Sequence, residues 1–200
     1  MKLNPRLLIG LVVALVSLFS YFGTREYNPV TQETQHVAIS ADQEVALGLQ
    51  AAPEMAQQYG GLSRDPKARA LVDQVGRKLV GSSGAGKTPY RFEFHTLADP
   101  KTINAFALPG GQVFITEALF RRLETEGQVA GVLGHEIGHV VARHGAEHMA
   151  KQRLTQGLTG AAVLATYDPS NPSTQATAAV AAMIGGLVNM KFGRRRARIG

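Results

Sequence analysis

The chain has 200 residues, a formal net charge of +6 and a pI near 9.8, a length that suits one domain with a single hydrophobic core. Five positive charges lie in the last ten residues, KFGRRRARIG. The remainder is therefore nearly neutral, which predicts no nucleic-acid partner. The absence of cysteine excludes disulfides and thiolate ligands to a metal.

The N-terminus combines positive charge with an apolar run. Lys2 and Arg6 precede Leu7 to Phe22, a run of 16 residues, whereas a bilayer span needs roughly 20. This pattern predicts a membrane anchor or signal sequence over residues 1–24, and the lack of a convincing Ala-x-Ala site favours an uncleaved anchor. Positive charge before the run predicts a cytoplasmic N-terminus, with the following domain on the other side of the membrane.

Residues 25–39 are polar, contain one proline and have no clear period, which predicts a tether. The folded domain is expected over residues 40–200. Its first helix begins at Ser40, which resembles a capping box together with Gln43. A second helix begins at Asp65, since proline follows it directly.

The segment GSSGAGKT, from Gly81 to Thr88, matches the phosphate-loop pattern letter for letter. A phosphate loop follows a buried strand and begins a helix, because the helix N-terminus holds the phosphates. Here a helix comes before, and the alternating apolar residues Tyr90, Phe92 and Phe94 come after. The segment is therefore predicted to be a connector that binds no nucleotide.

Two strands are predicted, Tyr90 to Leu97 and Val113 to Thr116, with Gly110 and Gly111 turning the chain between them. The intervening segment Asn104 to Leu108 could form an exposed edge strand, whose unpaired backbone groups would accept an extended peptide. The alternative is an ordinary core strand.

The sequence next predicts a short helix over Glu117 to Glu124 and a long helix that starts with a capping box at Thr125 and Gln128. Small residues recur along the long helix at steps of three and four, namely Gly131, Gly134, Gly138, Ala142 and Gly145. This stripe predicts close packing against another backbone. Together the elements indicate an α+β fold, mainly helical, with a small sheet and an N-terminal membrane anchor.

The long helix contains the sequence HEIGH at residues 135–139. Residues four apart lie on one helix face, so His135 and His139 can bind the same metal ion. A catalytic zinc keeps three protein ligands and one water, whose pKa falls to about 7 on binding. Glu136 lies beside the metal, where it can take a proton from the attacking water and pass it to the leaving amine.

The other histidines give weaker signals. His144 and His148 are again four residues apart, but a continuous helix places His144 about 140° around from His139. This angle predicts that His144 does not share the metal ion of the first pair. The second pair then lies on a solvated face or on one that contacts the ligands from outside the metal site, and a second metal site is the less favoured alternative. His36 and His95 have no partners that the sequence identifies.

Two apolar stretches follow, Leu158 to Ala165 and Ala178 to Val188, separated by the breaker sequence DPSNP. Both are shorter than a membrane span. They predict a helical hairpin packed on the active-site helix, and a hairpin that dips into the membrane is the alternative.

The runs NAFALPGGQVFITEALF and GQVAGVLGHEIGHVVARHG resemble the HtpX-like and CAAX-prenyl-protease-like family of membrane-associated zinc metallopeptidases, in particular its bacterial envelope members. The resemblance covers about residues 40–192. It implies a gluzincin-type endopeptidase with one zinc ion per chain, the zinc ligands His135 and His139, and the catalytic Glu136. It also implies a polypeptide substrate added as a strand, for which the binding residues are Asn104, Ala105, Phe106, Ala107 and Leu108. The expected location is the bacterial inner membrane with the domain facing the periplasm, or export.

The sequence departs from this family at its C-terminus. Such proteins carry a later helix with the pattern S-R-x-x-E-x-E-A-D, whose first Glu is the third zinc ligand, and Ala197 stands at that position. Asp168 and Glu117 are poorly placed substitutes. A frameshifted or truncated reading frame would produce this departure. The sequence thus predicts a protease of misfolded or membrane-associated envelope proteins, with an impaired pseudoprotease or a peptide-binding module as alternatives.

Overall fold

The computed structural model describes residues 4–166. The chain divides into two compact units, of which one comprises the residues up to Glu26 and those from His148 onward, and the other spans Tyr27–Glu147. Several features of the sequence lie outside the described residues: Asp168, the second apolar stretch, Ala197 and the basic tail.

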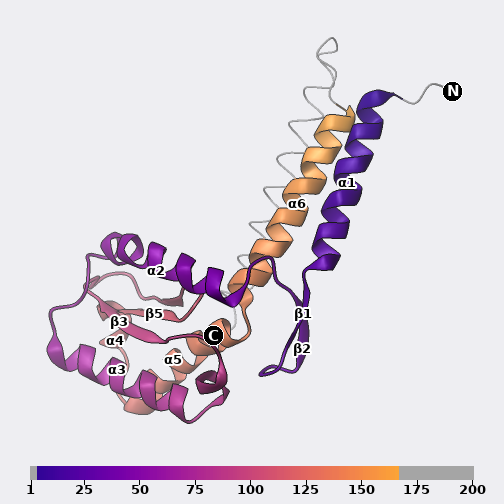
Figure 1. Cartoon of the computed structure of the whole chain (residues 1–200). Helices are drawn as coiled ribbons and strands as arrows, with labels where there is room; N and C mark the ends of the chain where they lie inside the picture. Colours follow the sequence, from indigo (N-terminus) through magenta and orange to yellow (C-terminus); the bar gives the residue numbers. More distant parts are fainter. Residues whose placement is uncertain (1–3, 167–200) are drawn as a thin grey trace. The chain divides into compact units, whose positions relative to one another are not determined.

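The first unit pairs α1 (Pro5–Gly23) with most of α6 (His144–Thr166), and the two helices lie side by side (Figure 1). Small residues allow their close approach, since a Cβ added to Gly10 would lie 2.7 Å from the Ala161 carbonyl oxygen. The first predicted apolar stretch therefore packs on α1, a partner that the sequence did not predict. By length and composition α1 could cross a membrane, and a signal sequence passes the same test.

The second unit contains a three-stranded sheet in the order β3-β5-β4. Its strands are β3 (Glu93–Leu97), β4 (Ala105–Ala107) and β5 (Gln112–Thr116). β5 is parallel to β3 and antiparallel to β4. The predicted glycine turn therefore joins β4 to β5, and not the two longer strands, because parallel neighbours need a longer crossover than a hairpin turn. β4 lies at the edge of this sheet, as one of the two alternatives for residues 104–108 predicted.

Helices cover both faces of the sheet (Figure 1). α2 (Ala41–Gln58) packs on one face, while α3 (Pro66–Gly81) and α5 (Glu126–Val141) pack on the other. The core between the sheet, α3 and α5 includes Val72, Val75, Phe94, Val113, Ile115, Leu133 and Ile137. Burial of this apolar surface fixes α5 against the sheet. On the opposite face the rings of His95, Phe114 and Phe106 stack in a row across the three strands.

The predicted helix starts are confirmed. Ser40 and Thr125 each form a capping box with the glutamine three residues later, and Asp65 caps α3. The segment that matches the phosphate-loop pattern contains a short 3-10 helix, Gly84–Lys87, and connects α3 to β3. This order is the one predicted for a connector. The next helix, α4 (Glu117–Phe120), is shorter than predicted.

A small hairpin replaces much of the predicted tether. Its strands are β1 (Arg25–Asn28) and β2 (Glu33–His36). The buried Asn28 side chain donates a hydrogen bond to the Val141 carbonyl oxygen at 2.8 Å, and the buried Gln35 side chain donates one to the Ala142 carbonyl oxygen at 2.5 Å. Carbonyl groups at a helix C-terminus lack partners within the helix. The hairpin therefore caps the end of α5, a role that local polarity does not reveal.

Candidate active site

The HEIGH sequence lies on α5, as predicted, and its two histidines converge. The Nε2 atoms of His135 and His139 are 3.0 Å apart. Two nitrogens that are each about 2.0–2.1 Å from a tetrahedral zinc stand roughly 3.3 Å apart. The donor type and the spacing therefore both fit two ligands of one zinc ion.

A third ligand is not found in the part of the chain that the structure describes. Among residues 4–166, no group of three or more histidine or acidic side chains is placed to hold a metal ion. Glu117 is engaged elsewhere, because it accepts a hydrogen bond from Ser63 at 2.6 Å and pairs with Arg121. The described residues therefore bring together two side chains, His135 and His139, that could hold a zinc ion.

Glu136 follows the first histidine and is half-buried. Burial raises the pKa of its carboxyl group to about 7, and a hydrogen bond from the Ala107 backbone N–H opposes this rise. A bound cation would favour the ionised form and lower this pKa. Beside a bound cation the Glu136 carboxyl group would therefore be ionised at neutral pH, the form that accepts a proton. The contact with Ala107 also places Glu136 beside the edge strand.

The pairing of β4 with β5 shows which backbone groups face the open edge. The Leu108 N–H donates to the Gln112 carbonyl, and the Asn104 carbonyl accepts from Thr116. Partners alternate along an antiparallel ladder, so Ala105 and Ala107 direct their N–H and C=O groups away from β5. The hydrogen bond from Ala107 to Glu136 agrees with this assignment.

The other side chains of this segment support the fold. The Asn104 side chain donates a hydrogen bond to the Tyr59 hydroxyl at 3.2 Å. The Phe106 ring stacks on Phe114, with 4.9 Å between the ring centroids. Any peptide recognition along β4 therefore depends on backbone groups more than on side chains, and peptide binding itself stays a prediction.

Among residues 4–166, no other element packs on three glycines of the predicted stripe. A Cβ added to Gly131, Gly134 or Gly138 would have no atom from another described element within 4 Å. The apolar side chains of α5 are buried on the side that faces the sheet and α3. Gly145 lies beyond the end of α5, where an added Cβ would be 3.1 Å from the ring of Pro109.

The structure also brings a third histidine to the site. α5 ends at Val141, Arg143 adopts a left-handed conformation with φ of 51°, and α6 begins at His144. This break returns His144 towards the ligands, and its Nδ1 atom lies 2.6 Å from the Nδ1 atom of His139. A face that contacts the ligands from outside the metal site is one predicted alternative for His144, but a continuous helix did not predict the break at Arg143 that brings the two rings together.

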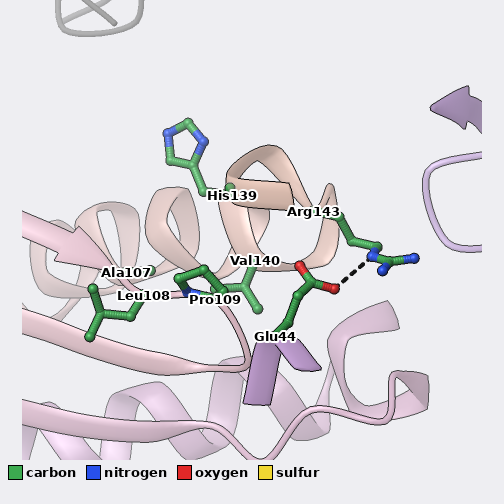
Figure 2. A pocket seen from close by; sticks show the side chains of 8 residues that line it. Glu44, Ala107, Leu108, Pro109, His139, Val140 and Arg143 are labelled. Atoms are coloured by element: carbon green, nitrogen blue, oxygen red, sulfur yellow. Dashed lines mark hydrogen bonds and ion pairs between the residues drawn. The ribbon is translucent and has the colours of Figure 1, made fainter. Parts of the chain in front are cut away.

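A buried ion pair lies at the same break. The Arg143 Nε atom donates to a Glu44 carboxylate oxygen at 2.8 Å, and the Tyr90 hydroxyl donates to that oxygen at 2.7 Å. The exposed fraction of Glu44 is only 1 %. Figure 2 shows this pair beside a pocket that His139 and the segment after β4 also line. Nothing local in the sequence identifies Glu44, since acidic residues are common in a first helical turn.

Comparison with known proteins gives concordant matches. The model of the protein family described as Peptidase family M48 matches residues 66–197 of this chain. The beta-barrel assembly-enhancing protease of Yersinia pestis is 31% identical over 174 residues, which are 87% of this chain and 35% of that protein. Its namesake in Escherichia coli (strain K12) is 36% identical over 132 residues, 66% of this chain and 26% of that protein. The mitochondrial metalloendopeptidase OMA1 of Schizosaccharomyces pombe is 35% identical over 118 residues, 58% of this chain and 34% of that protein. The chain thus spans about a third of the length of these relatives, or less.

Proposed function

Because the chain belongs to peptidase family M48, we propose that it is a zinc-dependent endopeptidase. One observation carries this proposal: a converging histidine pair and a carboxyl group of raised pKa lie together on one helix, next to an open strand edge. When bound, zinc acts as a Lewis acid on the scissile carbonyl group and lowers the pKa of a bound water molecule to near neutrality. Glu136 then takes the proton of the attacking water and passes it to the leaving amine.

The proposed substrate is an extended polypeptide that pairs with β4. Ala105 offers an outward N–H and C=O group and Ala107 an outward C=O group, and a fourth strand added beyond β4 would have its peptide bonds beside Glu136. Likeness to beta-barrel assembly-enhancing proteases supports envelope proteins as substrates. The apolar α1 supports attachment to the inner membrane, with the second unit facing the periplasm.

Replacing Ala105 with proline tests the strand-pairing proposal. Proline removes one outward N–H but is tolerated on an edge strand, because no ladder bond within the sheet is lost. We expect kcat/KM for an extended peptide to fall by about tenfold, on the scale of one lost hydrogen bond to substrate. Ala105→Gly is the matched control, since it removes the side chain and keeps the N–H. Equal activity in the two variants would show that the substrate does not pair with this residue.

A second candidate function is a peptide-binding module without catalysis. The observation in its favour is that the described residues supply two zinc ligands and that Ala197 stands at the position of the expected third. Loss of a carboxylate ligand weakens zinc binding, because its charge and its geometric constraint are both removed. Such a module would bind extended peptides along β4 and release them intact.

Zinc binding by the full chain in detergent separates the two candidates. The measurement compares the stoichiometry and affinity of zinc in the unaltered protein with those in Ala197→Glu. Tight equimolar zinc in the unaltered protein is the result expected of an endopeptidase, because another group must then complete the site. Weak zinc that Ala197→Glu restores would favour the binding module.

A further inference from the structure

We infer that His144 is a positioning residue for His139, whose orientation and proton position it fixes through their Nδ1 atoms. This inference rests on the proposed zinc site.

The two ring nitrogens of His139 face different partners. Its Nε2 atom lies 3.0 Å from Nε2 of His135, and its Nδ1 atom lies 2.6 Å from Nδ1 of His144. A ligand nitrogen must carry a lone pair, so the proton of neutral His139 has to be on Nδ1. His144 then accepts this N–H and holds the ring with Nε2 towards His135.

The same geometry keeps His144 out of the metal site. The Nδ1 atom of His144 lies beside Nδ1 of His139, whereas His135 lies on the Nε2 side of the same ring. A single zinc ion cannot bind both edges of one imidazole ring. His144 is therefore a hydrogen-bond partner of a ligand and not the third ligand itself.

The helix break is held in place by contacts on each of its residues. The side chains of Asn28 and Gln35 bind the carbonyl oxygens of Val141 and Ala142. Arg143, whose φ of 51° is uncommon for a residue other than glycine, is bound through its guanidinium to two groups, the Glu44 carboxylate and the Ile39 carbonyl oxygen. These contacts determine where α6 begins, and hence where His144 lies relative to His139.

The first test measures zinc affinity of the full chain in detergent by competition with a chelator. His144→Leu removes the acceptor and is expected to weaken zinc binding by about 10–100-fold, as the loss of a hydrogen bond behind a ligand does. His144→Asn is expected to stay close to the unaltered protein, because its side-chain oxygen can accept the same hydrogen bond. His148→Leu, at an exposed position four residues further along, is the control and should have no effect.

The second test reads the proton position of His139 directly. In the zinc-free protein, nitrogen NMR should find the proton of neutral His139 on Nδ1, and His144→Leu should shift it towards a mixture of both nitrogens. A merely structural role for His144 would not change this ratio. A His139 proton on Nε2 in the unaltered protein would overturn the inference.

The outcomes also separate this inference from the proposed function. Tight zinc in the unaltered protein with equal affinity in His144→Leu overturns the role of His144 and leaves the zinc site standing. Failure of the unaltered protein to bind zinc at all overturns the metal site, and the inference with it.

Discussion

Replacing Glu136 with glutamine is expected to lower peptide hydrolysis by the zinc-loaded protein by about 10²–10⁴-fold, the range that a general base contributes. Glutamine has nearly the same shape but cannot take a proton from water. The half-buried carboxyl group lies beside His135 and β4, so its proton transfer would occur where metal and peptide meet. The rate should be measured with an unstructured protein as substrate, at saturating zinc.

Two measurements make this result specific to the base. Zinc content should be unchanged in Glu136→Gln, because both histidines remain. Glu126→Gln is the matched control on the same helix, since Glu126 lies in the first turn and its 3.7 Å pair with Lys78 is exposed. Full activity in Glu136→Gln would remove this residue as the base and require another group to take the proton.

Replacing Arg143 with leucine is expected to lower the free energy of unfolding by about 3–5 kcal/mol, the usual cost of removing one partner from a buried ion pair. The Glu44 carboxylate stays 1 % exposed but loses the guanidinium. Chemical unfolding of the zinc-free full chain in detergent measures the change. Arg77→Leu is the control, because its pair with Asp73 is exposed on the surface of α3 and should hardly affect stability.

A double variant identifies the source of the loss. The double variant, Glu44→Leu with Arg143→Leu, lacks both charges of this buried pair. It contains the same leucine at position 143 as the single variant, so any effect of leucine on the backbone there is the same in both proteins. We expect the double variant to be more stable than Arg143→Leu alone, since apolar replacements of buried ion pairs are often neutral. If the two proteins were equally stable, the loss would come from packing or from the backbone and not from the stranded carboxylate.

The elements that the sequence predicted correctly are those with local causes. The capping boxes at Ser40 and Thr125 depend on residues three positions apart, and the structure contains both. The spacing of His135 and His139 on one helix likewise follows from the helical repeat alone. Family resemblance then supported the edge position of residues 104–108, which pattern alone left open between two alternatives.

The features that the sequence did not predict depend on distant partners. In the sequence Arg143 cannot be distinguished from an ordinary helical residue. Its left-handed conformation goes with an ion pair to Glu44, which lies 99 positions earlier. The polar Asn28 and Gln35 look like parts of a tether because their carbonyl partners are 113 and 107 positions away. The strand order β3-β5-β4 was not predicted for a similar reason, since the two glycines indicate a turn but not which strands the turn joins.

These separations impose an order on how the protein matures. α5 can begin from its own capping box, but its last carbonyl groups and the turn into α6 are held by side chains near the start of the second unit. Contacts this far apart in the chain form late in folding, because a long loop must first be closed. During synthesis the hairpin leaves the ribosome long before the helix that it caps. The arrangement around His139 is therefore completed only after almost all of the second unit, Tyr27–Glu147, has been made.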